Sequence, residues 1–254
     1  MDNNIPLPRL IHLNETDSTS KYLKTISKKE ELPSGSIVVA NFQTAGRGQM
    51  DNTWESEAGK NLTFSILFRP MDLPANMPFV ISKMVSLSVK CTLDKYIPDI
   101  FVKWPNDIYH EDKKIVGTLI ENTILQGKVS QSIIGIGINI NQTEFCSNAP
   151  NPVSMSQIIG KSLDLMTIME EFREIFMKQS ERINKKQFDS IHKDYLSSLY
   201  RKEGYHQYRD ADGIFEAAIH DIEPTGYIVL KRANNTYSRY AFKEVSFVNF
   251  ITKP

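Results

Sequence analysis

The spacing of hydrophobic and polar residues predicts both helices and strands in this chain. Tyr22, Leu23 and Ile26 follow a cluster of capping residues at helical spacing, so we expect a helix over 17–30. The same helical spacing recurs in three later segments, which are 77–96, 163–183 and 188–199. Strands are predicted where β-branched and aromatic residues cluster or alternate, at 35–42, 61–70, 100–105, 114–125 and 129–141.

The remaining segments predict where the chain turns and where its domains divide. Residues 109–114 are charged and are expected to form a turn, and 140–155 are rich in Asn, Pro and Ser and are expected to form a loop. After about residue 204, short strand-like runs alternate with Asp-Gly, Pro-Thr-Gly and Asn-Asn turns. We therefore expect an α+β protein, with helices packed on a mixed sheet in residues 1–200 and a small all-β domain in 201–254.

Composition narrows the class of protein. The 254 residues include 30 basic and 30 acidic side chains, and this balance argues against a large nucleic-acid footprint. The 2 cysteines have no metal-like spacing and do not suggest a disulfide scaffold. The N-terminus lacks the basic and apolar regions of a signal peptide, and no apolar run approaches the length of a membrane span. We expect a cytoplasmic protein.

Candidate chemistry begins at Phe42–Ser56, which reads FQTAGRGQMDNTWES. Glycine has no Cβ, so a ligand can approach the backbone N–H groups at Gly46 and Gly48. Arg47 between them adds a guanidinium suited to a carboxylate or a phosphate. A surface turn with a solvated arginine explains the tripeptide equally well. The loop is not a Walker A motif, because no Gly-Lys-Ser/Thr follows.

Two further segments carry polar groups beside predicted strands. KWPND at 103–107 presents an amide and a carboxylate close to the lysines of KKIVG at 113–117, although a charged hairpin turn has the same composition. GIGININ at 135–141 places Asn139 and Asn141 at period 2, where both can face one side and hydrogen-bond a ring. Its glycines are also typical of a buried strand that a helix approaches closely.

The order of these motifs resembles that of the biotin–protein ligases. DSTS at 17–20, QTAGRGQ followed by Trp54, KWPND followed by KKIVG, and GIGIN stand in the family's sequence, so the resemblance covers roughly residues 11–142. It implies a class II synthetase-like catalytic domain followed by an SH3-like β-barrel. It also implies ATP-dependent conversion of biotin to biotinyl-5′-AMP, and transfer of the biotinyl group to a lysine of a biotin carboxyl carrier protein.

The resemblance also implies roles for individual residues. Those of the biotin site are Ser18, Thr19, Gln43, Gly46, Arg47, Lys114, Gly117 and Leu119. Those of the ATP site are Gln49, Trp54, Lys103, Asn106 and Asn139, with Trp54 stacked on the adenine and Asn139 at its edge. The catalytic residues would be Lys114, Arg47 and Asp107, and Asp107 would orient the lysine or help to hold Mg²⁺. No set of metal ligands is predicted.

This chain differs from many members of the family in its glycine loop, and its oligomeric state and substrate stay open. Many relatives carry a second arginine where this chain has Gln49, and Met50–Asn52 replaces their usual basic or glycine-bearing continuation. The motifs begin at Asp17, which leaves no room for a winged-helix DNA-binding domain, so we expect a monofunctional enzyme that does not bind DNA. A homodimer is compatible with the sequence. The alternatives are a lipoate–protein ligase, with the same fold and adenylation chemistry, and a non-catalytic binding module.

Overall fold

The structure, a computed structural model, describes residues 7–49, 52–146 and 151–248. Its helices are α1 (Thr19–Lys29), α2 (Phe79–Leu93), α3 (Met155–Ile159), α4 (Leu165–Asn184) and α5 (Phe188–Ser197). The strands of its larger sheet are β1 (Leu10–Thr16), β2 (Ile37–Gln43), β3 (Leu62–Phe68), β4 (Ile100–Lys103), β5 (Asp107–His110), β6 (Lys113–Leu125) and β7 (Lys128–Ile138). The strands of its smaller sheet are β8 (His206–Asp210), β9 (Gly213–Ile222), β10 (Ile228–Arg232), β11 (Tyr237–Tyr240) and β12 (Ser246–Phe247).

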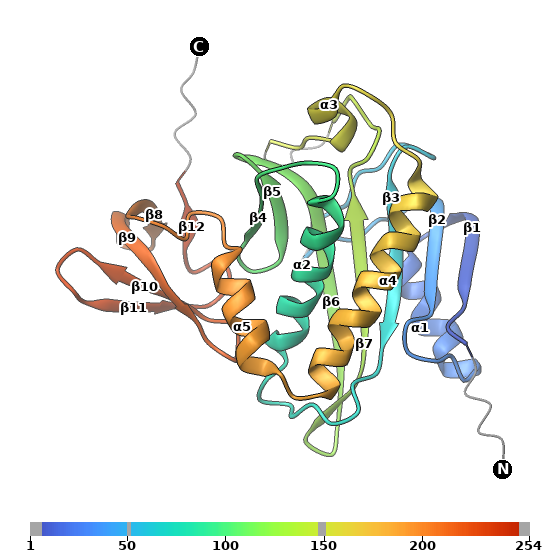
Figure 1. The fold of residues 1–254 in the computed structure, drawn as a ribbon, viewed down its shortest axis with the longest axis horizontal. Helices are drawn as coiled ribbons and strands as arrows, with labels where there is room; N and C mark the ends of the chain where they lie inside the picture. The colour runs from blue at the N-terminus through green and yellow to red at the C-terminus, as the bar shows by residue number, and fades with distance from the viewer. Residues whose placement is uncertain (1–6, 50–51, 147–150, 249–254) are drawn as a thin grey trace.

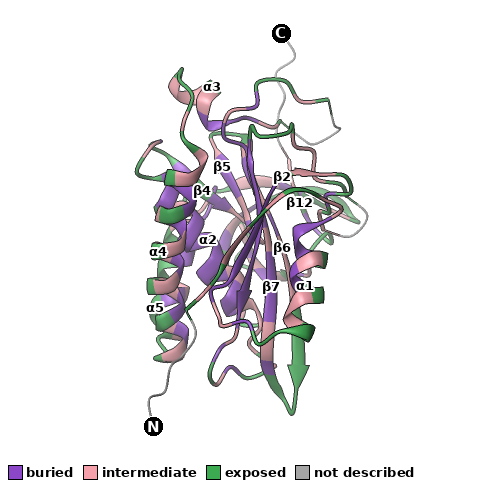
Figure 2. Cartoon of the chain, turned by 90° about the vertical axis from the view of Figure 1, so that its right-hand side faces the viewer, coloured by how far each residue is buried: buried purple, intermediate pink, exposed green. Residues whose placement is uncertain are grey.

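The larger sheet is mixed, as the sequence predicts. Its 7 strands lie in the order β1-β2-β3-β7-β6-β5-β4 (Figure 1). β1 and β2 are parallel, and the other neighbouring strands are antiparallel. Helix α1 covers one face of this sheet, and α2, α4 and α5 lie on the other (Figure 2). None of the described helices combines the length and apolarity that a membrane crossing requires.

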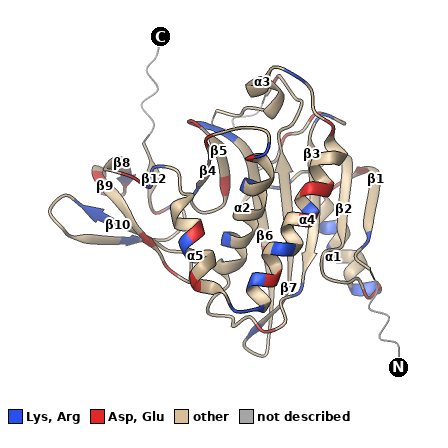
Figure 3. Cartoon of the chain, viewed as in Figure 1, with Lys and Arg blue, Asp and Glu red and all other residues tan. Residues whose placement is uncertain are grey.

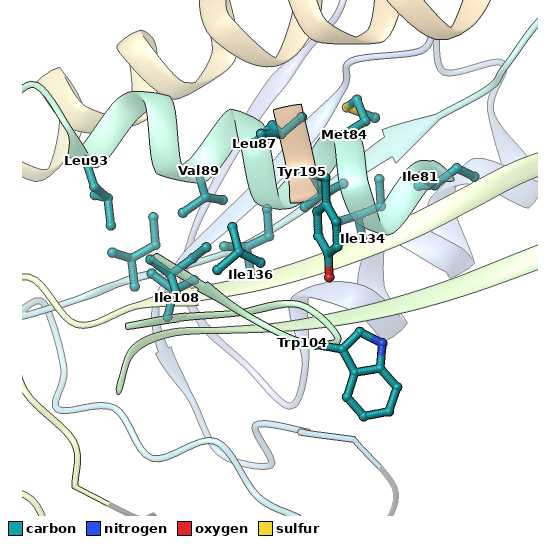
Figure 4. Packing of buried hydrophobic residues seen from close by; sticks show 14 of the residues in the cluster. Ile81, Met84, Leu87, Val89, Leu93, Trp104, Ile108, Ile134, Ile136 and Tyr195 are labelled. Carbon is teal, nitrogen blue, oxygen red and sulfur yellow. The ribbon is translucent and has the colours of Figure 1, made fainter. Parts of the chain in front are cut away.

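The main hydrophobic core lies between the sheet and the helices α2, α4 and α5. Alternate residues of β3 and β7 point into it, so that Phe64 meets Phe172 of α4 at 5.1 Å between ring centroids and Phe68 meets Phe176 at 6.0 Å. Figure 4 shows α2 laid over the sheet with its apolar side chains turned inward. Acidic and basic residues of α4 and α5 occupy the side away from the sheet (Figure 3). This division follows the amphipathic pattern of both helices.

The smaller sheet packs against the larger unit near the end of β4. Its 5 strands are antiparallel, in the order β11-β10-β9-β8-β12. Trp104 Nε1 donates to the carbonyl oxygen of Gly226 at 2.9 Å, and Lys83 Nζ of α2 donates to the carbonyl oxygen of Ile222 at 3.1 Å. The prediction of helices on a mixed sheet with a small β unit is therefore confirmed. The barrel form of that unit and the boundary at 200/201 stay predictions.

Three elements differ from the pattern-based expectations. β1 was not expected, because as an edge strand it carries exposed polar residues and no clear alternation. The segment expected to be a turn at 109–114 instead contains the end of β5 and the start of β6, with only Glu111 and Asp112 between them. α3 begins at Met155 inside the expected loop, where Ser154 and Gln157 form a capping box. Part of that loop, 147–150, lies outside the described residues.

Candidate active site

A pocket of about 300 Å³ lies on the α1 side of the larger sheet. Its walls come from the N-terminal end of α1, the glycine loop after β2, and strands β6 and β7. The residues of β7 explain why the pocket forms on this face. Ile134, Ile136 and Ile138 belong to the hydrophobic core on the helix-covered face, and Gly135 and Gly137 alternate with them and line the pocket.

Neutral hydrogen-bonding groups line one end of the pocket. The backbone N–H and Oγ1 of Thr19 both donate to Gln43 Oε1, at 2.8 and 3.1 Å, and Thr19 Oγ1 lies 2.8 Å from Ser65 Oγ. Ser18 and Thr19 are buried at the start of α1. Because these side chains hold one another in place, they form a preorganised polar surface for a neutral ligand group.

The glycine loop is a small hairpin. Arg47 and Thr53 form an antiparallel bridge, Trp54 N donates to Gly46 O at 3.0 Å, and Gly48 N donates to Asn52 O at 2.7 Å. A Cβ atom at Gly46 would lie 2.5 Å from the carbonyl oxygen of Trp54, so glycine is required for the two arms to approach. The expectation that the Gly48 N–H faces a ligand is wrong in this structure, because that N–H closes the hairpin.

Trp54 lies on the glycine positions of β6 and β7. Gly117 and Gly137 are cross-strand partners, and a Cβ atom at Gly137 would lie 2.1 Å from Cε2 of the indole. The Nε1 atom of Trp54 is buried and has no hydrogen-bond partner among the described residues. Buried polar groups in proteins are nearly always paired, so this N–H marks a place where a ligand atom can accept.

The charged end of the pocket is formed by Lys114 and Asp107. Lys114 Nζ donates to Asp107 Oδ2 at 2.8 Å, and both side chains are only partly exposed. Gln49 approaches from the glycine loop and donates from Nε2 to Asn106 Oδ1 at 2.8 Å. Asn106 is itself buried, and its Nδ2 donates to the carbonyl oxygen of Thr118 at 3.2 Å. Lys114 therefore presents an oriented ammonium group to the pocket.

The two asparagines after β7 do not act on the same side. Asn139 lines the pocket; its Nδ2 donates to Val153 O at 3.3 Å, and its Oδ1 is buried without a partner among the described residues. Asn141 instead exchanges hydrogen bonds with the backbone of Leu163, at 2.8 and 2.9 Å. The expectation that both face one ring is therefore wrong, because Asn141 fastens the loop that leads to α4.

The structure brings most of the predicted site residues together. The predicted residues that line the pocket are Ser18, Thr19, Gln43, Arg47, Gln49, Trp54, Asp107, Lys114, Gly117, Leu119 and Asn139. Gly46 and Asn106 lie directly behind this lining, against Trp54 and Gln49. Lys103 is not among the lining residues: its Nζ sits 4.4 Å from the centre of the Tyr109 ring and 5.4 Å from that of Phe247. It is the cross-strand partner of Asp107 at the charged end, so its assignment to the ATP site stays a prediction. Burial lowers the pKa of Lys103.

Several lining residues lie outside the predicted set. Thr53 and Glu55 flank Trp54, so period-2 alternation from Trp54 indicates neither of them. Phe242 reaches the pocket from the turn between β11 and β12, in contact with Trp104 at 6.1 Å between ring centroids. No local pattern places it there, because its position depends on how the smaller sheet packs on the larger unit.

The described residues contain no group of three or more His, Cys, Asp or Glu side chains arranged to hold a metal ion. Asp107 and Glu55 are the carboxylates among the lining residues. Magnesium commonly binds through one or two carboxylates while keeping waters and nucleotide phosphates as its other ligands. Asp107, next to Lys114, therefore suits a magnesium ion that arrives with a nucleotide, without a dedicated protein cage.

Comparison with known proteins identifies relatives with this fold. The model of the Biotin/lipoate A/B protein ligase family matches residues 13–139, half of the chain. The bifunctional ligase/repressor BirA of Bacillus subtilis is 32% identical over 174 residues, 67% of this chain and 53% of that protein. Biotin–protein ligase 2 of Arabidopsis thaliana is 31% identical over 163 residues, 59% of this chain and 48% of that protein. The matches thus span about half the length of these curated relatives.

Solved structures extend the likeness over nearly the whole chain. The biotin protein ligase of Aquifex aeolicus in complex with biotin and ATP has a TM-score of 0.76 at 25% identity, and the match covers 94% of this chain and 98% of that one. The matched family residues 13–139 contain the polar end, the glycine loop and the lysine–aspartate end of the pocket. This chain therefore belongs to the biotin/lipoate A/B protein ligase family.

Proposed function

We propose that this chain is a biotin–protein ligase. In the first step, a carboxylate oxygen of biotin attacks the α-phosphorus of ATP; pyrophosphate leaves, and biotinyl-5′-AMP forms. In the second step, a lysine amine of a biotin carboxyl carrier protein attacks the carbonyl carbon of that anhydride, AMP leaves, and an amide forms with loss of the amine's proton. Both substrates occur together in the related Aquifex aeolicus structure.

The observation that carries the proposal is that one pocket has a neutral polar end and a cationic end. Thr19, Gln43 and Ser18 offer donors and acceptors that suit an uncharged ureido ring. Lys114 supplies positive charge at the other end, where a carboxylate and an α-phosphate must come together, and Arg47 adds a second cation from the glycine loop. Biotin has a ureido ring at one end and a carboxylate at the other, so its two ends match the pocket.

Each charged residue has a distinct task in the adenylation step. Two anions repel, and Lys114 would offset this by donating to the oxygens on which charge builds up in the transition state. Asp107, 2.8 Å from Lys114 Nζ, orients the ammonium group. When bound, magnesium would neutralise nucleotide phosphates, and Asp107 is the residue suited to hold it.

Trp54 and Asn139 would bind the adenine. The indole provides a flat apolar surface for stacking. The unpaired Oδ1 of Asn139 is an acceptor that matches an exocyclic amino group. Because Trp54 belongs to the glycine loop, closure of that loop over the nucleotide would also keep water from the mixed anhydride.

The alternative within the family is a lipoate–protein ligase, because the matched family includes both types. The dithiolane ring of lipoate lacks the ureido donors and acceptors. It would gain no hydrogen bonds from Thr19, Gln43 and Ser18, whereas a ureido ring would. The polar end of the pocket therefore supports biotin.

ATP–pyrophosphate exchange decides between these substrates. The protein is incubated with ATP, Mg²⁺ and labelled pyrophosphate, and with biotin, lipoate or neither. We expect exchange with biotin only. Exchange with lipoate alone would establish the lipoate ligase. If neither acid supports exchange, the non-catalytic binding module becomes the better account.

The wider properties of the protein are part of the same proposal. We infer a catalytic domain at about 1–200 and an SH3-like β-barrel at about 201–254, which would help to dock the carrier protein beside the pocket. Phe242, which reaches the pocket from the smaller sheet, supports that arrangement. A cytoplasmic location, the absence of DNA binding and a homodimeric state are further expectations, testable by fractionation, mobility shift and light scattering.

A further inference from the structure

Glu121 lies on β6 at the edge of the pocket. It follows Gly117 and Leu119 at period 2, so it is on the same face of the sheet as these two pocket residues. Its Oε2 accepts from Arg47 Nη2 at 3.0 Å, and its Oε1 lies 3.6 Å from Lys24 Nζ of α1. The carboxylate is 29% exposed and connects the glycine loop to both the sheet and the first helix.

Arg47 reaches the pocket from a loop and needs to be oriented. Nearly half of its side chain is exposed, so no dense packing selects one rotamer. Among the described residues, Glu121 is the hydrogen-bond partner of its guanidinium, and the bond uses Nη2. The Nε and Nη1 groups stay available for a second anion, because the planar guanidinium carries five N–H donors in a fixed arrangement.

We propose that Glu121 is a positioning residue for the adenylation step: it holds Arg47 so that the guanidinium faces the carboxylate of the acid substrate. This rests on the proposed function. An arginine that is ordered before the ligand arrives does not lose its side-chain entropy on binding, and that saving appears as affinity. Arg47 already lines the pocket while it is paired with Glu121, so this pairing and ligand contact are compatible.

Lys24 adds a second positive charge beside the Glu121 carboxylate. The group of Lys24, Glu121 and Arg47 carries two positive charges and one negative charge, so an approaching carboxylate still meets a net positive charge. Because all three side chains are partly exposed, their pairs contribute little to the stability of the fold. Removal of Glu121 should therefore change the orientation of the Arg47 side chain and leave the protein folded.

The test measures biotin-dependent pyrophosphate exchange in Glu121→Ala and Glu121→Gln. We expect Glu121→Ala to raise the KM for biotin about fivefold, with kcat within about twofold and an unchanged melting temperature. Glu121→Gln keeps an acceptor for Arg47 and should recover part of the loss. Asp94→Ala, which removes a partly exposed carboxylate paired with Lys90 at the end of α2, is the control and should leave KM unchanged.

The double variant Arg47→Ala/Glu121→Ala decides whether Glu121 acts through Arg47. If it does, removing Glu121 has no further effect once Arg47 is absent. If Glu121→Ala raises the KM for biotin by the same factor with and without Arg47, the proposal is overturned. A lower KM in Glu121→Ala would also overturn it, because it would show that Glu121 and the biotin carboxylate compete for Arg47. The Nε–Hε signal of Arg47 in NMR gives an independent readout, expected to become more mobile in Glu121→Ala. If wild type shows no biotin-dependent exchange, the proposed function fails, and the NMR comparison still tests the positioning role.

Discussion

The two faces of strand β7 carry opposite kinds of residue. On the face covered by α2 and α4, Ile134, Ile136 and Ile138 pack into the main core. On the other face, Gly135 and Gly137 leave space that Ser20 and the Trp54 indole occupy. Between Ile134 and Ile138, β7 therefore contributes to stability through one set of alternate residues and to the binding site through the other. Nearer the start of the strand, Ile133 on the pocket-side face packs in a second hydrophobic cluster. Substitutions only one position apart should thus separate stability from activity.

The largest effect should come from the core face. Ile134 is fully buried, so Ile134→Ala leaves a cavity and should lower the free energy of unfolding by about 2–5 kcal/mol. The matched variant on the pocket face is Gly137→Ala, whose methyl group would displace the indole of Trp54. We expect it to raise the KM for ATP while largely preserving stability. Urea unfolding and ATP–pyrophosphate exchange kinetics are measured on both variants. If both variants lose the same free energy of unfolding, the two faces of β7 do not differ in the way described.

The second prediction concerns the charged end of the pocket. Lys114→Ala should lower the adenylation rate by about 10²–10³, equivalent to about 2.7–4 kcal/mol of barrier, because a preorganised charged donor is lost. The melting temperature should change little, since the Lys114–Asp107 pair is partly exposed. Lys113→Ala, on the exposed neighbouring residue, is the control. A rate within a few-fold of wild type in single-turnover adenylation would contradict this role.

The third prediction concerns Lys83, an ionisable residue on the helix-covered side of the sheet. Lys83 of α2 is buried between α5 and β9, and its Nζ contacts His192 Nδ1 at 2.7 Å. The same Nζ lies near the rings of Phe79 and Tyr195. The acidic group nearby is Asp221. Burial lowers its pKa from 10.5 to about 8, against the opposing effect of Asp221.

The sign of the pH dependence follows from this lowered pKa. Between pH 8 and 10.5 the unfolded chain binds a proton at Lys83 that the folded protein does not, so the contribution of Lys83 to stability rises with pH in that window. Below pH 8 both states are protonated, and the contribution is constant. Unfolding free energies of wild type minus those of Lys83→Met should therefore rise from pH 8 to 10.5. A flat difference would show that Lys83 titrates normally in the folded protein.

The smallest effect is expected at Gln49, an uncharged residue of the glycine loop beside the charged end of the pocket. Its Nε2 donates to Asn106 Oδ1 and to Thr118 O, so the neutral amide is held near the charged end. A charge-assisted hydrogen bond exceeds a neutral one by about 1 kcal/mol. Gln49→Arg should therefore slow the release of biotinyl-AMP several-fold. Stopped-flow dissociation from the two proteins is the measurement, and equal rates would show that position 49 does not control retention.

The sequence predicted those parts of the molecule that depend on local pattern. The amphipathic α4 and the strands β3 and β7 were predicted in this way. The pocket residues within contiguous motifs came instead from the resemblance of those motifs to the biotin–protein ligases. β1 was missed because it is an edge strand with exposed polar residues, and β5 because it is only 4 residues long. Lys103 was assigned to ATP from its motif, and this assignment stays a prediction. Its contact with Phe247 depends on how the smaller sheet packs, whereas Tyr109 lies on the neighbouring strand β5.

Contacts between distant segments were the least predictable part of the site. Phe242 and Glu121 lie far in sequence from the glycine loop, yet one lines the pocket and the other binds Arg47. Glu121 could have been found by extending the period-2 pattern from Gly117 and Leu119, whereas Phe242 had no such signal. The glycines of the loop were expected to let a ligand approach the backbone, but Gly46 is needed for close approach of the two hairpin arms, and the Gly48 N–H closes the hairpin.

The most direct test of the account is native mass spectrometry of the protein after incubation with ATP, Mg²⁺ and biotin. The account predicts one biotinyl-AMP bound per chain in wild type, and none in Lys114→Ala under the same conditions. A wild-type protein that stays free of the adenylate, or a Lys114→Ala variant that accumulates it at the wild-type rate, would contradict the central claim that this pocket joins biotin to AMP through Lys114.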